Sequence, residues 1–380
     1  MKKIVIVKHH IQLTRRLIRD SEWKNSAVAL FYGGLASYYL TKPDHDKAQK
    51  IANKLICKKI LIGHYYLANS YFLFARYEQA ENELKQITGY ETIADCVFLL
   101  VDIFYRTNRF NEAWTLLENL ARVNKRKKIW LYMARLVKNK EDSIRFQANI
   151  DYVRENTNFL KKDELLSAKT DALMRAGLSE QAIKLWQNQE KSKPSSLSYA
   201  MDQKLARVAL EDLKSALDNN NIIFFLISGT LLGCIREKNF LANDKDIDVG
   251  VWDTHNYDEL VMAVSGSGCF YIIKNRTKNI VQIRHVNGIN IDIFVHHREE
   301  NDYWHAALKL KWHNTPFTLM EWQFLGKNYL IPTDYDLYLT ENYGDWKTPK
   351  TKFDSTYDTP NAEVINQAEF LLYQQRRYRF

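Results

Sequence analysis

The spacing of apolar side chains divides the chain into two parts. Over residues 1–190, apolar positions recur every three or four residues, which predicts one helix after another. Further along the chain the period shortens to two, and short apolar runs alternate with polar residues, as in strands. We therefore predict a multidomain protein, with an all-α domain over residues 1–190 and an α/β or α+β domain over residues 197–380.

The helical part contains an internal repeat. Ala48, Ala80 and Ala113 lie 32 and 33 residues apart, and Tyr77 and Phe110 each precede one of these alanines by three residues. Tetratricopeptide repeats have a similar period of about 34 residues, and their small residues let the two helices of a hairpin touch. We predict a tetratricopeptide-like helical repeat array. An irregular helical bundle with chance periodicity is the alternative.

Repeat arrays of this kind present extended binding surfaces. We therefore expect the helical domain to dock a protein partner or to hold a polysaccharide acceptor. Its large aromatic residues have two alternative roles, packing between hairpins or binding a partner at the surface. Packing is the expected role of Tyr65, Tyr66, Trp114 and Trp130.

The composition changes at Lys191–Ser196, whose proline and serines predict a linker. Of the 13 glycines only five precede this segment, and five of the six prolines lie at Pro194 or later. One amphipathic helix is expected over Tyr199–Leu217. The strands predicted after this helix are Ile222–Ser228, Asp246–Trp252, Phe270–Ile273, Ile280–His285 and Ile289–His296.

Charge and cysteine content narrow the functional classes. The 54 Lys and Arg residues exceed the 45 Asp and Glu residues, and the net charge of +9 favours an anionic partner such as a phosphate-rich substrate, nucleic acid or an acidic membrane surface. The four cysteines have no CxxC spacing, which argues against a disulfide framework and a structural zinc site. No apolar run approaches the roughly 20 residues of a membrane span, and Met1–Lys8 is too short in its apolar part for a signal peptide. We therefore expect a cytoplasmic protein.

Two acidic residues alternate with apolar ones on a predicted strand. Asp246 and Asp248 flank Ile247, so both carboxylates project from the same face. Adjacent carboxylates repel each other unless a cation lies between them, and hard oxygen ligands suit Mg²⁺ or Mn²⁺. Asp244 extends the series to Asp-x-Asp-x-Asp. A solvated strand end without a metal is the alternative.

A glycine turn precedes these acids. Ser228, Gly229 and Thr230 follow an apolar strand and open a helical pattern. Glycine lets a phosphate approach the backbone, and the first N–H groups of a helix attract anions. Thr230 also suits an N-cap, which is the alternative to a ligand-binding role. The turn and the acids together predict a site for a phosphate and a metal ion.

A further acid lies on a later strand. Asp292 has apolar neighbours, and Asn290 shares its face. A buried lone carboxylate is costly unless it is paired or binds a metal. We therefore predict that Asp292 joins the two acids of the earlier strand; a strand with one face in water is the alternative. His296 and His297 follow on the same strand, but adjacent strand residues point to opposite faces, so we do not expect them to bind one ion.

Together these motifs resemble the signature of the LicD/fukutin family, over residues 200–350. In chain order the motifs are Gly229–Arg236, Asp244–Asp248, Asp292–Phe294 and Ile331–Trp346. The resemblance implies a nucleotidyltransferase-like fold. It also implies a metal-dependent transferase that moves a phospho-group, such as phosphocholine, ribitol phosphate or glycerol phosphate, from a CDP-activated donor to a glycan acceptor.

The resemblance further implies roles for individual residues. The implied ligands of Mg²⁺ or Mn²⁺ are Asp244, Asp246, Asp248 and Asp292. The implied catalytic residues are Asp246, Asp248 and Asp292, the last as metal ligand or general base. The implied contacts to the donor are Gly229, Thr230 and Arg236. For Arg236, a salt bridge on its own helix is the alternative.

Two residues depart from the family pattern. Asn243 stands where the family carries a tryptophan, and Lys245 replaces the middle acid of the run, although we expect its side chain to point away from the metal face. One rival function is a catalytically inactive repeat scaffold, and another is a nucleotidyltransferase acting on RNA or small nucleotides. The chain has no aromatic-studded basic stretch, so nucleic acid is not the expected partner. The resemblance implies work on cell-surface polysaccharide at the inner face of a membrane.

Overall fold

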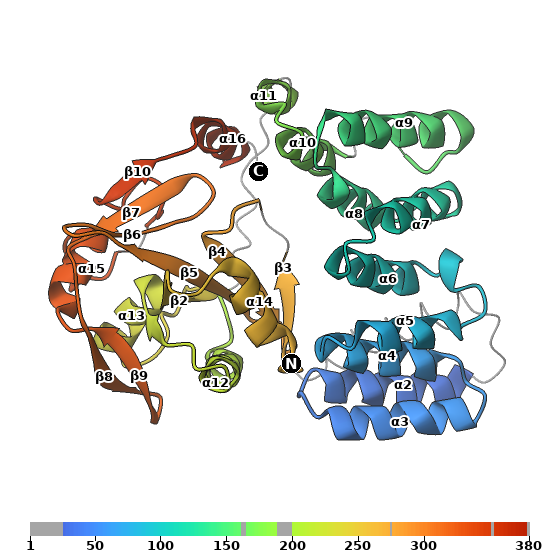
Figure 1. The fold of residues 1–380 in the computed structure, drawn as a ribbon, viewed down its shortest axis with the longest axis horizontal. Helices are drawn as coiled ribbons and strands as arrows, with labels where there is room; N and C mark the ends of the chain where they lie inside the picture. The colour runs from blue at the N-terminus through green and yellow to red at the C-terminus, as the bar shows by residue number, and fades with distance from the viewer. Residues whose placement is uncertain (1–25, 161–164, 188–199, 274–275, 351–352, 378–380) are drawn as a thin grey trace. The chain divides into compact units, whose positions relative to one another are not determined.

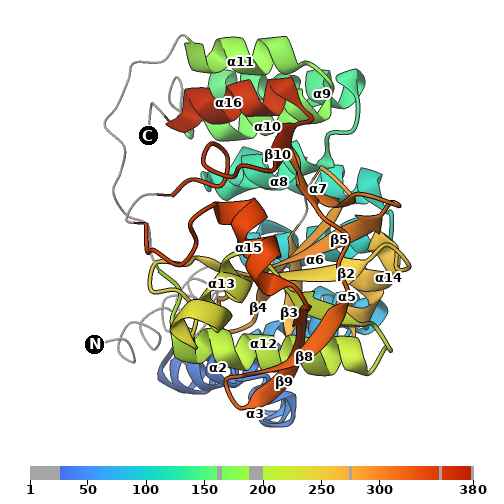
Figure 2. The ribbon, with the colours of Figure 1, turned by 90° about the vertical axis from the view of Figure 1, so that its left-hand side faces the viewer.

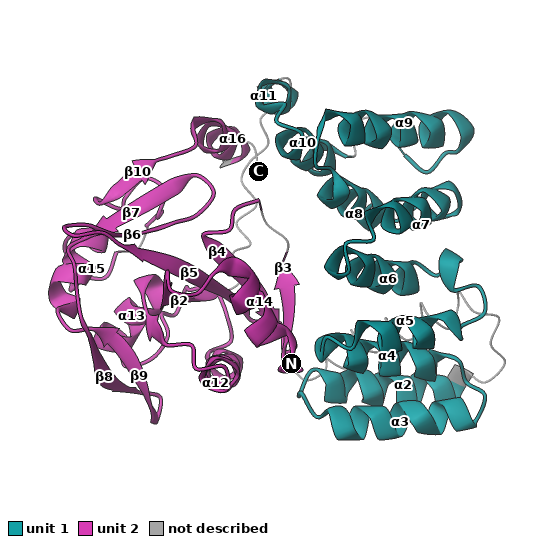
Figure 3. Ribbon diagram, in the orientation of Figure 1, with its two compact units in different colours: residues 1–191, 379 teal, residues 192–378, 380 magenta. Residues whose placement is uncertain are grey.

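The structure is a computed structural model that describes residues 26–160, 165–187, 200–273, 276–350 and 353–377. The chain divides into two compact units, Met1–Lys191 and Ser192–Tyr378, which Figure 3 shows in different colours. The linker predicted at 191–196 lies outside the described residues.

The N-terminal unit is helical throughout its described part, as predicted. Figure 1 shows its helices following one another in chain order from blue to green. The α-helices are α2 (Ser26–Leu40), α3 (His45–Cys57), α4 (Ile62–Leu73), α5 (Tyr77–Lys85), α6 (Ala94–Arg106), α7 (Phe110–Val123), α8 (Lys128–Leu136), α9 (Lys140–Asn156), α10 (Leu166–Arg175) and α11 (Ser179–Gln187), with a 3₁₀ turn η1 (Tyr90–Thr92) before α6. The tetratricopeptide type of this array stays a prediction.

Small residues lie where these helices touch. Ala48 on α3, Ala80 on α5 and Ala113 on α7 are at most 1% exposed, which fits the close helix contacts that the repeat spacing predicts. The large aromatic residues in question, Tyr65, Tyr66, Trp114 and Trp130, are all buried. They pack in the interior as expected, and the alternative of a binding surface is excluded for them.

The C-terminal unit is built on a mixed sheet of ten strands. Its strands are β1 (Phe224–Leu226), β2 (Asp246–Trp252), β3 (Phe270–Ile273), β4 (Ile280–His285), β5 (Asn290–Arg298), β6 (Tyr303–Ala306), β7 (Leu310–Asn314), β8 (Leu319–Phe324), β9 (Lys327–Pro332) and β10 (Ala362–Val364). The order across the sheet is β10-β7-β6-β5-β2-β1-β9-β8, and β4 joins β3 to β5. A helical region followed by a mixed sheet is the architecture that the sequence predicted.

Helices cover this sheet. They are α12 (Gln203–Asp218), α13 (Ser228–Leu232) with its π-helical continuation η2 (Gly233–Glu237), α14 (Tyr257–Ser265), α15 (Tyr335–Tyr343) and α16 (Gln367–Arg377). The helices α12 and α14 pack against each other, whereas α13 packs against β2 and α15. Figure 2 shows α13 and α15 on the near side of β2 and β5. No helix in the described ranges has both the length and the apolar character needed to cross a bilayer.

Most predicted elements appear with small differences. The strands β2, β3 and β4 have the predicted bounds, whereas β5 begins one residue later and ends two residues later than predicted. The strand β1 is shorter than predicted because the chain turns into α13 at Ser228. The helix α12 begins at Gln203 because the Asp202 carboxylate caps it by accepting the N–H groups of Lys204 and Leu205. The predicted start at Tyr199 lies outside the described residues.

The parallel pair β2 and β5 forms the centre of the sheet. On β2 the side chains of Ile247, Val249 and Val251 are fully buried, and they alternate with the acids. Gly250 interrupts the alternation because a Cβ there would lie 2.5 Å from the ring of Phe225 on β1. Apolar alternation therefore fixes which face of β2 carries the carboxylates.

Candidate active site

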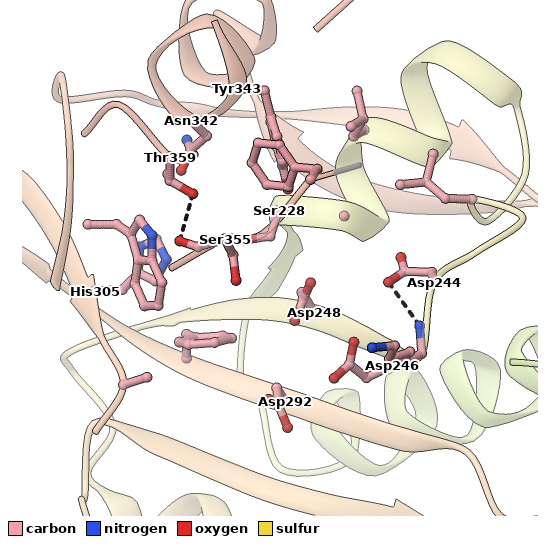
Figure 4. Close-up of a pocket in the computed structure, with 18 of the residues that line it drawn as sticks. Ser228, Asp244, Asp246, Asp248, Asp292, His305, Asn342, Tyr343, Ser355 and Thr359 are labelled. Atoms are coloured by element: carbon pink, nitrogen blue, oxygen red, sulfur yellow. Dashed lines mark hydrogen bonds between the residues drawn. The ribbon is translucent and has the colours of Figure 1, made fainter. Parts of the chain in front are cut away.

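The two central strands bring the predicted acids together. In the parallel register of β2 and β5, Asp246 pairs with Asn290 and Asp248 pairs with Asp292, so the last two carboxylates are neighbours on one face. In Figure 4, Asp246, Asp248 and Asp292 gather at one cavity, and Asp244 approaches from the loop before β2. The cavity has a volume of about 550 Å³. All four predicted acids therefore line one cavity.

This environment disfavours several negative charges at once. Burial and the charge of Asp246 raise the pKa of Asp244 to about 7, and the same two causes raise the pKa of Asp292 to about 7. Burial and the charges of the other three acids raise the pKa of Asp248 well above its ordinary value. Burial also raises the pKa of Asp246, although the charge of Lys245 opposes this change. A cation among the carboxylates would offset both burial and repulsion.

The turn from β1 into α13 places backbone atoms next to these acids. Ser228 has a φ of 47°, a left-handed conformation that is strained in a non-glycine residue and that occurs often at functional sites. A Cβ on Gly229 would lie 2.8 Å from Oδ2 of Asp244, so glycine leaves room for that carboxylate. The backbone N–H of Gly229 donates to the Asp248 carboxylate and lowers its pKa. The amide that we predicted to face a phosphate therefore contacts an acid of the site.

Thr230 has a different position from the one predicted. Its side chain is fully buried, its hydroxyl oxygen accepts the backbone N–H of Asp248 at 2.8 Å, and it is not among the described residues that line the cavity. The N-cap of α13 is Ile227, which makes no side-chain cap hydrogen bond. This corrects both the predicted donor contact and the N-cap alternative, because Thr230 instead fastens β2 to α13.

Arg236 lies on η2 and lines the cavity. Its Nε donates to Oε1 of Glu237 at 2.8 Å, which is the salt-bridge alternative, and its Nη1 donates to the backbone oxygen of Trp346 at 2.8 Å. The second bond holds the segment after α15 against the cavity wall. Lys245 also lines the cavity, and its positive charge opposes the rise in the pKa of Asp244 and Asp246.

Gln282 is a site residue that the sequence did not predict. It lies on β4 opposite Asp292, and its Nε2 donates to both oxygens of that carboxylate, at 3.1 and 3.2 Å. This contact opposes the effect of burial by lowering the pKa of Asp292. Because the contact depends on the register between two strands, no local motif marks it.

The opposite wall of the cavity comes from β6, β7 and the chain from the end of α15 onward. Most of its residues are aromatic or polar, and Ala307 and Leu308 add apolar surface. The aromatic and polar ones are His305, Trp312, Asn342, Tyr343, Asp345, Trp346, Thr348, Lys350, Phe353, Ser355 and Thr359. Asn342, Tyr343, Asp345 and Trp346 lie within the last motif quoted above, whereas the others are irregularly spaced and had no signal in the sequence.

His296 and His297 have different surroundings, in keeping with their adjacent places on a strand. His296 is fully buried, burial lowers its pKa to about 3, and its ring stacks on that of His305 with 4.3 Å between centroids. The ring of His297 stacks on Trp304 at 3.9 Å.

The chemistry of the four acids fits a hard divalent cation. Carboxylate oxygens are the ligands that Mg²⁺ prefers, and Oδ2 of Asp244 is buried without a hydrogen-bond partner. In the described structure no three of these side chains bring their oxygens within 4.8 Å of one another. Like charges without a cation are expected to stay apart in this way. Binding would therefore require small movements of the carboxylates toward the ion.

Comparison with known proteins adds a family to this geometry. Residues 221–334 match the family described as LicD/FKTN/FKRP, nucleotidyltransferase domain. The C-terminal half contains a LicD/FKTN/FKRP domain. The matched range of this LicD/FKTN/FKRP domain includes all four acids and Gln282, whereas the part of the cavity wall from Asn342 to Thr359 lies beyond it.

Several curated proteins share sequence with this chain. Ribitol-5-phosphate transferase FKTN of Homo sapiens is 24% identical over 173 residues, which cover 42% of this chain and 37% of the human protein. The protein of the same name from Mus musculus has the same identity and coverage. The uncharacterized protein RP689 of Rickettsia prowazekii (strain Madrid E) is 23% identical over 154 residues, or 36% of this chain and 53% of that protein. The chain with its LicD/FKTN/FKRP domain therefore spans less than two thirds of each of these relatives.

Proposed function

We propose that this protein is a metal-dependent transferase that moves a phospho-group from a CDP-activated donor to a hydroxyl group of a glycan acceptor. The phospho-group would be ribitol phosphate, glycerol phosphate or phosphocholine. The observation that carries the proposal is the register of β2 and β5, which sets Asp248 beside Asp292 at the cavity. The similarity to a ribitol-5-phosphate transferase supports the class of reaction.

The proposed cofactor is Mg²⁺ or Mn²⁺. Asp246 and Asp248 would hold it, and Asp244 would contribute its buried Oδ2, which has no other partner among the described residues. When bound, the cation would neutralise charge on the donor diphosphate and on the leaving CMP. The raised pKa values of these acids reflect the cost of ionising them in the cavity, and a bound cation would offset that cost.

The reaction itself needs a proton acceptor. A bond forms between the acceptor oxygen and the phosphorus that carries the transferred group, and the bond from that phosphorus to the bridging oxygen breaks, so that CMP leaves. We propose that Asp292 accepts the proton of the acceptor hydroxyl group, because a carboxylate with a pKa of about 7 can take up a proton near neutral pH. Gln282 would orient the Asp292 carboxylate.

The remaining lining residues suit the rest of the two substrates. Arg236, Lys245 and Lys350 offer positive charge to the diphosphate. Trp312, whose ring stacks on that of the buried His305 with 5.2 Å between centroids, offers a flat surface of the kind that binds a sugar ring or a nucleobase. We propose that the donor phosphates lie near the acids and that a ring of donor or acceptor lies against this aromatic wall.

A donor screen tests this function. The full chain is incubated with CDP-ribitol, CDP-glycerol or CDP-choline and Mg²⁺, with and without a glycan acceptor, and CMP is measured. Asp246→Asn and Asp248→Asn should each lower CMP release by at least about 100-fold. The matched control is Asp258→Asn on α14, whose side chain is 77% exposed and which should leave release unchanged. No CMP from any donor, or full activity in Asp248→Asn, would exclude the transferase.

The helical unit has a proposed role of its own. We propose that it docks a protein partner or the acceptor polysaccharide, as repeat arrays do. A folded chain that binds such a partner but releases no CMP would support the rival function of an inactive scaffold. The cytoplasmic location at the inner face of a membrane stays a prediction.

A further inference from the structure

A second group of ligand-type side chains lies where α12 meets the hairpin of β3 and β4. It consists of Asp212 on α12, Cys269 immediately before β3, and His285 at the end of β4. A carboxylate oxygen, the Sγ and a ring nitrogen of these residues all lie within 4.8 Å of one another. No other group of three such residues in the described ranges is gathered so closely, and none of the three lines the cavity of the aspartates.

Backbone hydrogen bonds hold these segments in place. The backbone oxygen of Cys269 accepts the N–H of Val286 at 2.8 Å, which fixes the start of β3 beside the end of β4. The Nδ2 of Asn287, in the turn after β4, donates to the backbone oxygen of Leu205 on α12 at 2.9 Å. The cluster is therefore held by contacts that do not involve its own side chains.

Both ring nitrogens of the histidine have hydrogen-bond partners, and the cysteine thiol has one. The side chain of His285 is fully buried, with Nε2 at 2.9 Å from Oδ2 of Asp212 and Nδ1 accepting the N–H of Asn287 at 3.2 Å. The Cys269 thiol donates to the backbone oxygen of Ser267 at 3.5 Å. Burial and the adjacent Asp212 carboxylate raise the pKa of Cys269 to about 12. A thiolate beside a carboxylate is unfavourable unless a cation lies between them.

We propose that Asp212, Cys269 and His285 bind a Zn²⁺ ion, with water at the fourth position. Thiolate, imidazole and carboxylate are the ligands that Zn²⁺ combines in tetrahedral sites, whereas Mg²⁺ takes oxygen ligands. The side chain of Asp212 is 30% exposed, which gives the ion access and leaves room for water. By joining α12 to both strands of the hairpin, the ion stabilises β4, the strand that carries Gln282.

Binding of Zn²⁺ to these side chains displaces a proton. Cys269 loses its thiol proton to solvent and forms the S–Zn bond. His285 binds through Nε2, and the proton of that nitrogen moves to Nδ1, so the contact from the N–H of Asn287 has to loosen. One proton is released for each Zn²⁺ bound. This site is independent of the proposed transferase, because it shares no ligand with the aspartates.

Cobalt(II) provides a direct test, because a cobalt–thiolate bond absorbs in the near ultraviolet and cobalt with oxygen ligands does not. The full chain is stripped of metal with a chelator and titrated with Co²⁺, and the zinc content of the protein as purified is measured by mass spectrometry. The wild-type chain should bind one Co²⁺ with a thiolate band. Cys269→Ser should remove this band, whereas Cys57→Ser, an exposed cysteine of the other unit, should keep it.

Two further variants separate the outcomes. Asp212→Asn should keep the band but weaken Co²⁺ affinity by about tenfold or more. Asp248→Asn should leave band and affinity unchanged whatever its effect on CMP release. A folded wild-type chain with neither zinc nor a thiolate band overturns the proposal, as does a band that survives in Cys269→Ser. If Cys269→Ser does not fold, the proposal is tested by the thiolate band of the wild type and by the Co²⁺ affinity of Asp212→Asn.

Discussion

Replacing Asp292 with asparagine should stabilise the metal-free protein at alkaline pH. Burial and the charge of Asp246 raise the pKa of Asp292 from 3.8 to about 7. A carboxyl group whose pKa is raised by folding contributes stability below its unfolded pKa, and this contribution is lost as the pH rises through the folded pKa. The metal-free wild type should therefore lose stability between about pH 4 and about pH 7, and asparagine should suppress that loss.

The size of the effect follows from the same pKa. A rise from 3.8 to about 7 corresponds to on the order of 4 kcal/mol, because each pH unit is worth about 1.4 kcal/mol. Asparagine keeps the shape of the side chain, and its carbonyl oxygen can still accept a hydrogen bond from Gln282. Solvent screening and relaxation of the other acids reduce the gain, so we expect about 2–3 kcal/mol at pH 8.

Urea unfolding in the presence of a chelator, at about pH 4 and about pH 8, measures this difference. The transition of the C-terminal unit is identified as the one that should shift when Mg²⁺ is added. Saturating Mg²⁺ should stabilise the wild type more than Asp292→Asn, because the ion offsets a charge that the variant lacks. The control Asp258→Asn, at an exposed carboxylate of α14, should stay within about 0.5 kcal/mol of the wild type.

Two results would refute this reasoning. One is an Asp292→Asn variant that is no more stable than the wild type at pH 8 in chelator. The other is a free-energy difference of the same size at both pH values, which would point to packing and not to charge.

Three other substitutions test separate parts of the structure. Thr230→Val removes the acceptor for the backbone N–H of Asp248 and should cost about 1–3 kcal/mol in urea unfolding; no loss would contradict the role given to this hydroxyl. Gly229→Ala places a Cβ 2.8 Å from Oδ2 of Asp244, so it should weaken Mg²⁺ binding about tenfold, as measured by calorimetry, with little change in the free energy of unfolding. An unchanged Mg²⁺ affinity would remove Asp244 from the ligand set. Trp130→Ala leaves a cavity beside Phe146 and should destabilise the helical unit by about 3–5 kcal/mol, as measured by circular dichroism. The Mg²⁺ affinity should stay unchanged, and a weaker affinity would contradict the separation of the two units.

The fold could be predicted where one face of an element is buried and the other is wet or charged. The strand β2 has this alternation, and the sequence predicted its bounds correctly. The strand β8 also alternates, with Met320, Trp322 and Phe324 on the more buried face and Glu321 and Gln323 exposed, yet it was not among the predicted strands. The three-residue strand β10 pairs with β7, which lies much earlier in the chain, so no local pattern marks this pair.

The site could be predicted only where its residues are close in the sequence or share a motif. Asp246 and Asp248 belong to one strand, and the costly burial of Asp292 indicated a partner. By contrast, Gln282 reaches Asp292 through the β4–β5 register, and His305 belongs to a wall built by a later part of the chain. The cysteine spacing likewise gave no sign of a zinc site, because its three proposed ligands come from separate segments.

Neighbouring strands hold β5 along both of its edges. Its partner on one edge is β2, while β4 and then β6 pair with successive parts of the other edge. A slip by one residue would turn Asp292 into the apolar interior and would break all of these ladders together. Intermediates with a shifted β5 therefore cannot assemble the acids. Binding of a divalent ion by these acids would therefore show that the sheet has its final register, and it would stabilise that register against a slip.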